Sequence, residues 1–130
     1  MSTEGRLQDV SILVVDDDPD ILEVMSLALE SEGASLVTAT TGDEAVTSYA
    51  TRRPELVVLD MMLPKKSGFL VLEQIQGSED PPPVIMVTAN EGRRHKAYAE
   101  TLGVSAYLNK PVPMERLLET AVEVLDRAGS

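Results

Sequence analysis

The chain contains no cysteine and no tryptophan, and it has only three tyrosines and one phenylalanine in 130 residues. Without cysteine, disulfides, thiolate metal ligands and cysteine nucleophiles are excluded. Aromatic residues make up 3% of the chain and apolar residues 43%. A hydrophobic core must therefore be built mainly from aliphatic side chains, and the length is typical of one domain.

Long apolar runs are also missing. No segment approaches the roughly 20 apolar residues of a membrane-spanning helix, and the start, MSTEGRLQDV, lacks the apolar stretch of a secretory signal. Basic residues are scarce, because 22 acidic and 11 basic residues give a net charge of −11. We therefore expect a cytoplasmic protein that does not insert into membranes. We also expect no direct contact with nucleic acid, whose phosphates attract basic surfaces.

Five short apolar segments rich in β-branched residues indicate strands. They lie at 10–15, 35–39, 56–59, 84–87 and 104–108. The first, third and fourth are nearly continuous in apolar character, which is typical of strands buried on both faces.

Helical patterns alternate with these segments. The expected helices follow caps at Asp18, Thr41 and Ser67 and cover 91–102 and 113–127. The helix at 91–102 is the weakest, because few of its residues can make apolar contacts. Alternation of strand and helix predicts an α/β fold, with a doubly wound five-stranded parallel sheet and helices on both faces.

The sequence indicates one domain with short ends. We expect the domain to span 9–127, with 1–8 as a flexible N-terminus and 128–130 as a C-terminal end. The initial Met favours a natural single-domain protein; the alternative is a domain excised from a larger regulator.

Polar side chains follow four of the five predicted strands. Asp16 and Asp17 follow the first, Asp60 the third, Thr88 the fourth and Lys110 the fifth. Ligands of open parallel sheets bind outside the carboxyl ends of the strands, so we expect these groups to converge. Carboxylates beside a hydroxyl and an ammonium suit Mg²⁺ next to a phosphoryl group. An aspartate can itself be the nucleophile of phosphoryl transfer, forming an acyl phosphate.

Four motifs occur in a characteristic order: VVDDDP, LVVLDMMLPKKSG, VIMVTA and AYLNKP. Over residues 10–127 they closely resemble the receiver domain of two-component response regulators. The resemblance implies a flavodoxin-like sheet of strand order 2-1-3-4-5. It also implies that Asp60 accepts a phosphoryl group from a sensor histidine kinase or a histidine phosphotransfer protein. By the same resemblance, Mg²⁺ is bound by Asp16, Asp17, Asp60 and the Met62 backbone carbonyl.

The resemblance further assigns a switch. Thr88 is the switch hydroxyl, Lys110 contacts the phosphate, and Tyr107 is the switch aromatic. On phosphorylation the face formed by 91–127 would change shape and bind a downstream protein. The domain would be a monomer or weak homodimer, and it would catalyse only its own phosphorylation and dephosphorylation.

One departure from the family pattern concerns the lifetime of the phosphoryl group. Met62 stands two residues after the acceptor, a position that tunes this lifetime in the family. Because a methionine side chain cannot orient a water molecule strongly, we expect slower self-hydrolysis than a polar residue at this position would give.

Other interpretations compete with a phosphorylated receiver. The acids at 16–18 can serve only a helix N-terminus, and Tyr107 can serve only packing. A small Mg²⁺-dependent phosphatase of the haloacid dehalogenase type also uses an aspartate nucleophile. Its opening motif needs DxDx[TV], whereas Asp16-x-Asp18 is followed by Pro19-Asp20. An unphosphorylated receiver-like adaptor is disfavoured, because every site residue is retained.

Overall fold

A computed structural model describes residues 5–89 and 92–129. Its five parallel strands form one sheet in the order β2-β1-β3-β4-β5, which confirms the predicted fold class and strand order. The strands are β1 (Ser11–Val15), β2 (Ser35–Ala39), β3 (Leu56–Leu59), β4 (Val84–Thr88) and β5 (Ala106–Asn109). The helices are α1 (Pro19–Ser31), α2 (Gly42–Thr51), α3 (Gly68–Gln76), α4 (Arg93–Thr101) and α5 (Met114–Ala128).

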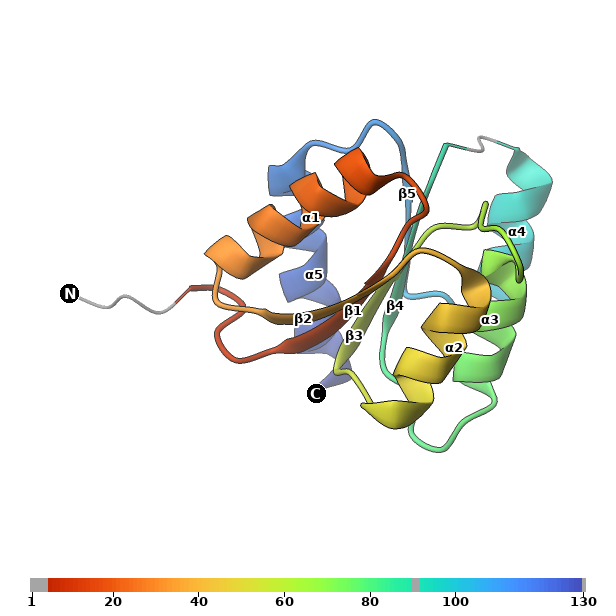
Figure 1. The fold of residues 1–130 in the computed structure, drawn as a ribbon, viewed down its shortest axis with the longest axis horizontal. Helices are drawn as coiled ribbons and strands as arrows, with labels where there is room; N and C mark the ends of the chain where they lie inside the picture. Colours follow the sequence, from red (N-terminus) through yellow and green to blue (C-terminus); the bar gives the residue numbers. More distant parts are fainter. Residues whose placement is uncertain (1–4, 90–91, 130) are drawn as a thin grey trace.

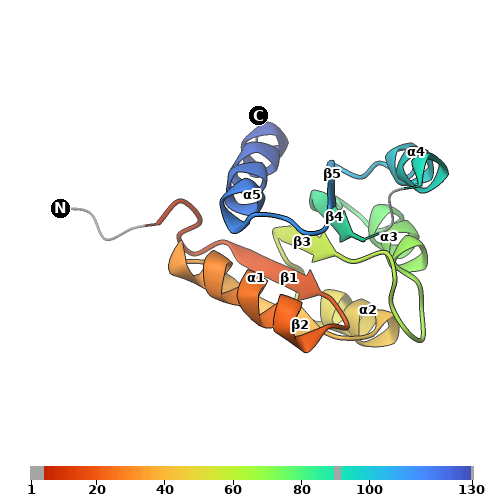
Figure 2. The same ribbon diagram turned by 90° about the horizontal axis from the view of Figure 1, so that it is seen from above.

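Helices cover both faces of the sheet. Figures 1 and 2 show α1 and α5 on one face and α2, α3 and α4 on the other. Successive residues of a central strand therefore enter different cores. In β1, Ile12 and Val14 pack with α1 and α5, whereas Leu13 and Val15 pack on the opposite face. Both faces exclude water, which explains the continuous apolar character of β1, β3 and β4 in the sequence.

The first three helices begin where a side chain caps them, as predicted. Asp18 Oδ1 accepts hydrogen bonds from the backbone N–H groups of Asp20 and Ile21, at 2.9 and 3.3 Å. The Thr41 hydroxyl accepts the Glu44 N–H at 3.1 Å, and the Ser67 hydroxyl starts α3 in the same way. These bonds satisfy backbone donors that a helix N-terminus otherwise leaves unpaired.

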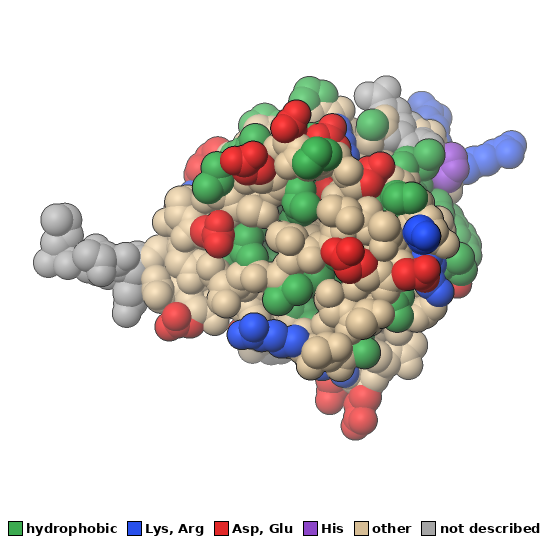
Figure 3. Space-filling view, in the orientation of Figure 1, with side chains coloured by type: hydrophobic (Ala, Val, Ile, Leu, Met, Phe, Trp, Pro, Cys, Tyr) green, Lys and Arg blue, Asp and Glu red, His purple; other side chains and the backbone are tan. Residues whose placement is uncertain are grey.

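Helix α4 is stabilised less well by its own sequence. Its N-cap residue, Gly92, has no side chain that could cap the helix, and its first turn holds no acid. Arg93, Arg94 and Lys96 lie there instead, where positive charge opposes the helix dipole. These side chains are exposed, and Figure 3 shows Lys, Arg and His side chains at the upper right, over α4. Ala99 is its only buried residue within the described part of the helix.

Contacts with α3 hold α4 in place. The Phe69 ring lies edge-on to Tyr98 at 5.0 Å between centroids and stacks on His95 at 5.9 Å. The Tyr98 hydroxyl donates to Glu73 at 2.8 Å, and the Gln76 side-chain amide donates to the Leu102 carbonyl at 2.9 Å. Helix α4 therefore rests on α3 through aromatic and polar contacts rather than through an aliphatic stripe.

The fifth strand begins later than predicted. It starts at Ala106 instead of residue 104. The preceding residues are used by the turn that ends α4, in which Gly103 adopts a φ of 90° and the Val104 N–H donates to the Ala99 carbonyl at 3.1 Å. The apolar character of Val104 reflects packing of this turn against the core.

Residues 5–8 lie against the domain, within the stretch 1–8 for which we expect a flexible N-terminus. Leu7 is only 1% exposed in the core beneath α1 and α5, and its N–H donates to the Glu32 carbonyl at 2.9 Å. The Arg6 guanidinium bonds Glu32 at 3.1 Å and Glu115 at 2.8 Å. One leucine in a polar stretch gives no periodic pattern, so its burial was not apparent from the sequence.

We expect Leu7→Ala to lower the free energy of unfolding by about 2–4 kcal/mol, because it empties a buried site. The neighbouring Gln8→Ala is the control, since Gln8 is exposed, and it should change stability by less than about 0.5 kcal/mol. Urea denaturation measures both changes. Equal effects of the two substitutions would show that this segment adds no packing energy.

Candidate functional site

The connections that follow β1, β3 and β5 meet at one edge of the sheet, the upper edge in Figure 1. Asp16 follows β1 and Asp60 follows β3. The Asp60 N–H donates to the Val15 carbonyl at 3.0 Å, which fixes the two acids side by side. Both are buried, with exposed fractions of 0% and 4%, whereas Asp17 faces solvent.

Lys110 joins the two buried acids. Its Nζ lies 2.7 Å from Asp16 Oδ2 and 3.2 Å from Asp60 Oδ2. Its backbone N–H donates to the Thr88 carbonyl at 2.9 Å, and so the ends of β4 and β5 are tied together. The sequence pointed to Lys110 as a phosphate contact, but its ion pairs with both carboxylates were not expected.

Three carboxylates make a candidate metal centre. One oxygen each of Asp16, Asp17 and Asp60 lies within 4.8 Å of the others. Three negative charges face one ammonium group, so a divalent cation would balance the cluster. Exposed Asp17 leaves a way in from solvent. Hard oxygen ligands with space for water suit Mg²⁺.

The remaining carboxylate oxygens of the two buried acids accept hydrogen bonds from backbone N–H groups of the loops that follow them. Asp16 Oδ1 accepts the Asp18 N–H at 2.9 Å, and Asp60 Oδ1 accepts the Met62 N–H at 3.1 Å. The run of acids is therefore divided by function. Asp16 points into the site, Asp17 reaches solvent and Asp18 caps α1.

Burial and charge shift the pKa values of this cluster. Burial raises the pKa of the Asp60 carboxyl, and it outweighs the opposing effects of the Met62 N–H and Lys110. For Lys110, burial disfavours the charged form, but the hydrogen bond to Asp16 and the charge of Asp60 outweigh it and raise the pKa. The ammonium stays protonated at neutral pH, and the Asp60 carboxylate is more basic than a solvated one.

Two glycines shape the loop after Asp60. A Cβ at Gly68 would collide with the Asp60 carbonyl, and one at Gly42 would collide with the Lys66 carbonyl. The Gly42 N–H also donates to the Pro64 carbonyl at 3.2 Å. The start of α2 therefore supports the acceptor loop. No local signal in the sequence identified the contact of Gly42 with this loop.

The other predicted residues lie around this centre. Thr88 is fully buried at the end of β4. Tyr107 in β5 is half-buried against the α2–α4 core, and burial raises its pKa. Met62 is 60% exposed. The peptide bond between Lys110 and Pro111 is cis. The switching role of Thr88 and Tyr107 stays a prediction.

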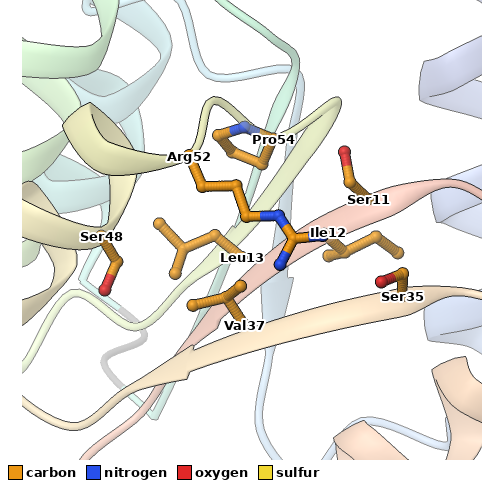
Figure 4. A pocket seen from close by; sticks show the side chains of 8 residues that line it. All are labelled: Ser11, Ile12, Leu13, Ser35, Val37, Ser48, Arg52 and Pro54. Atoms are coloured by element: carbon orange, nitrogen blue, oxygen red, sulfur yellow. The ribbon is translucent and has the colours of Figure 1, made fainter.

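Two hollows differ in their relation to the site. A groove of about 570 Å³ runs beside it, between α1 and the connection from β5 to α5. Its lining is mainly apolar and includes Val24 and Val112 together with Lys110. A second hollow lies at the opposite end of the strands, where the Arg52 side chain extends toward Ile12 (Figure 4). It is remote from the acids and has no part in the site.

Comparison with known sequences gives the family. The sequence pattern of the response regulator receiver domain matches residues 12–122. The chain belongs to this family. This receiver domain is 36% identical over 122 residues to the probable transcriptional regulatory protein TcrX of Mycobacterium tuberculosis. The alignment covers 94% of this chain and 52% of TcrX. The family consists of signalling domains rather than metabolic enzymes, and no comparison supports the phosphatase alternative.

Further relatives and solved structures agree. The receiver domain is 38% identical over 100 residues to the alkaline phosphatase synthesis transcriptional regulatory protein PhoP of Bacillus subtilis, covering 77% of this chain and 42% of PhoP. The chain thus spans about half the length of these curated relatives. A CheY-like receiver domain protein of Methanospirillum hungatei superposes with a TM-score of 0.90 at 31% identity, over 94% of this chain and 98% of that one. Within the described residues, no helix is both long and apolar enough to cross a membrane.

We expect Asp60→Asn to stabilise the receiver domain at neutral pH in buffer with EDTA, because it removes a buried charge facing Asp16. A gain of about 1 kcal/mol would raise the melting temperature by roughly 4 °C. The raised pKa means that the native state binds the proton more tightly than the unfolded state, so wild-type stability falls as pH rises through that range. The gain should therefore shrink as the pH is lowered.

Asp17→Asn is the matched control, because it changes the net charge equally at an exposed position. Its effect on the melting temperature should be smaller. A melting temperature of Asp60→Asn below that of the wild type at pH 7 would contradict the electrostatic account.

Proposed function

We propose that this receiver domain is a switch controlled by phosphorylation of Asp60 in a two-component pathway. The contact of the Lys110 ammonium with both buried carboxylates is the observation that carries the proposal. A structural lysine needs one partner; here the cation lies between two acids at the exposed edge of a sheet. Such an arrangement can stabilise charge that arrives on Asp60.

The chemistry follows from the contacts of Asp60. A carboxylate oxygen attacks the phosphorus of a phosphohistidine, an O–P bond forms, the P–N bond breaks, and the donor imidazole leaves. The raised pKa makes this carboxylate a stronger nucleophile than an exposed one. Lys110 can then move from the carboxylates to a phosphoryl oxygen, with the Thr88 hydroxyl as the second contact.

Magnesium fits the oxygen donors described above. When bound, it offsets the negative charge that gathers as the carboxylate and the phosphoryl group approach each other. Asp16, Asp17, Asp60 and the Met62 backbone carbonyl would hold it. The burial of Asp16 and Asp60 keeps two of these ligands fixed before any ion binds.

The conformational change on phosphorylation would begin at the end of β4 and extend to α4 and α5. The Thr88 carbonyl accepts the Lys110 N–H, so movement of either residue strains the other. Tyr107 pairs with Met86 of β4 and can turn toward the space that Thr88 leaves. Among the described residues, helix α4 has no capping side chain at its N-cap and one buried residue, which favours it as the element that yields most easily.

The partners follow from this scheme. A sensor histidine kinase or a histidine phosphotransfer protein supplies the phosphoryl group, and a downstream protein binds the face formed by 91–127. Residue 91 lies outside the described part of the chain. We place the domain in the cytoplasm as a monomer or weak homodimer without direct contact to nucleic acid, in keeping with its net charge of −11.

We expect acetyl phosphate and Mg²⁺ to add one phosphoryl group to the wild-type protein, measured by intact mass. Asp60→Asn should show no gain, because the nucleophile is lost. Lys110→Ala should lower the rate by about 100-fold, since it removes the cation at the reacting carboxylate. Glu119→Gln, on an exposed turn of α5, should behave like the wild type. A phosphorylated Asp60→Asn protein would disprove the assignment.

We expect Met62→Asn to shorten the lifetime of the phosphoryl group by about threefold or more, because an amide can orient a water that a thioether cannot. Loss of phosphate is followed by mass after the phosphodonor has been removed. The control is Leu70→Asn, which introduces the same amide at an exposed apolar position of α3. An unchanged or longer lifetime of Met62→Asn would contradict this interpretation.

A further inference from the structure

We propose that Met62 is a site of reversible oxidation and that its sulfoxide shortens the lifetime of the phosphoryl group on Asp60. The inference rests on the proposed function of Asp60. The oxidant is a hydroperoxide, and the consequence is a receiver that loses its signal faster under oxidising conditions.

Met62 has the most solvent-exposed side chain of the methionines that the structure describes. Met62 is 60% exposed, whereas Met25 and Met61 are each 2% exposed and Met86 is fully buried. Met114 is half-buried at the start of α5. Among the methionines that the structure describes, Met62 is therefore the one most open to a dissolved oxidant, because oxidation of methionine follows solvent access.

The backbone couples Met62 to the acceptor. Its N–H donates to Asp60 Oδ1 at 3.1 Å, so its Cα is held close to the carboxylate. The Gly68 N–H donates to the Met61 carbonyl at 2.9 Å and closes the loop on the far side. The other carboxylate oxygen, Oδ2, faces Lys110 inside the site. The backbone therefore places a largely exposed side chain two residues from the buried acceptor.

Oxidation of the Met62 thioether needs a peroxide and no other reactant. The thioether sulfur attacks the peroxide, the O–O bond breaks and an S–O bond forms. Sulfur loses two electrons, and hydrogen peroxide is reduced to water. A thiol-dependent methionine sulfoxide reductase reverses the change.

The sulfoxide changes the environment of the acyl phosphate. A thioether is a weak hydrogen-bond acceptor, whereas a sulfoxide oxygen is polar and accepts strongly. On an exposed side chain two residues from the acceptor, it can hold and orient the water that hydrolyses the acyl phosphate. Oxidation of Met62 should therefore shorten the lifetime of the phosphoryl group, as a polar substitution at this position would.

The first measurement is the selectivity of oxidation. The wild-type protein is treated with dilute hydrogen peroxide, and sulfoxide formation is followed by fragmentation mass spectrometry of the peptide that holds Met61 and Met62. We expect Met62 to react at least about tenfold faster than Met61, because only its side chain is exposed. Equal rates at the two neighbours would overturn the proposal.

The second measurement is the lifetime of the phosphoryl group. Oxidised and untreated wild-type proteins are phosphorylated with acetyl phosphate and Mg²⁺, and the decay of each is timed after the donor has been removed. We expect the oxidised protein to lose phosphate about three- to tenfold faster. Treatment with methionine sulfoxide reductases A and B should restore the original rate.

Two variants separate Met62 from other effects of peroxide. The Met62→Leu variant should lose its phosphoryl group at the same rate before and after peroxide treatment. The Met114→Leu variant should lose it faster after peroxide treatment, as the wild type does. A peroxide effect that persists in Met62→Leu would overturn the proposal, as would an unchanged lifetime of the oxidised wild type. If the untreated protein takes up no phosphoryl group, the proposed function fails together with this inference. If it takes one up and peroxide leaves its decay unchanged, only this inference fails.

Discussion

The lysine ammonium held between two buried carboxylates is the interaction on which the site depends. Asp16 and Asp60 lie together and are almost fully buried, so their charges repel each other more strongly than in water. One cation compensates for only part of that charge and leaves a negative excess, while burial is the main cause of the raised pKa of Asp60. The same excess makes the cluster receptive to a divalent ion. The proposed reactivity and the proposed metal affinity thus both depend on carboxylates that are buried and only partly neutralised.

The fold makes this arrangement possible. Parallel strands bring residues that lie 94 positions apart, Asp16 and Lys110, to within hydrogen-bond distance. Burial on both faces of the sheet fixes the strands, and the site forms where each strand leaves the core. The side of the molecule that carries α4 is less well stabilised, since that helix lies on α3 by aromatic and polar contacts. The acids of the site are thus fixed by packing on both faces of the sheet, whereas α4 has one buried residue in its described part.

The general architecture could be predicted because its signals are local. Continuous apolar runs identify strands buried on both faces, and the caps at Asp18, Thr41 and Ser67 identify helix starts. The convergence of the site followed from a rule about strand ends. Burial of Leu7, contact of Gly42 with the acceptor loop and the pairing of Lys110 with Asp16 could not be predicted. Each depends on packing between distant segments, which leaves no periodic trace in the sequence.

The close approach of Gly42 to Lys66 has a consequence for how such a domain can diverge. Helix α2 and the loop from Met61 to Ser67 touch backbone to backbone, with no side chain between them to absorb a change in length. Insertions or deletions in that loop would shift the helix as well as the acceptor. Substitutions should therefore accumulate on the outer surfaces of the helices. The number of residues between the acceptor and helix α3 should stay the same in related domains.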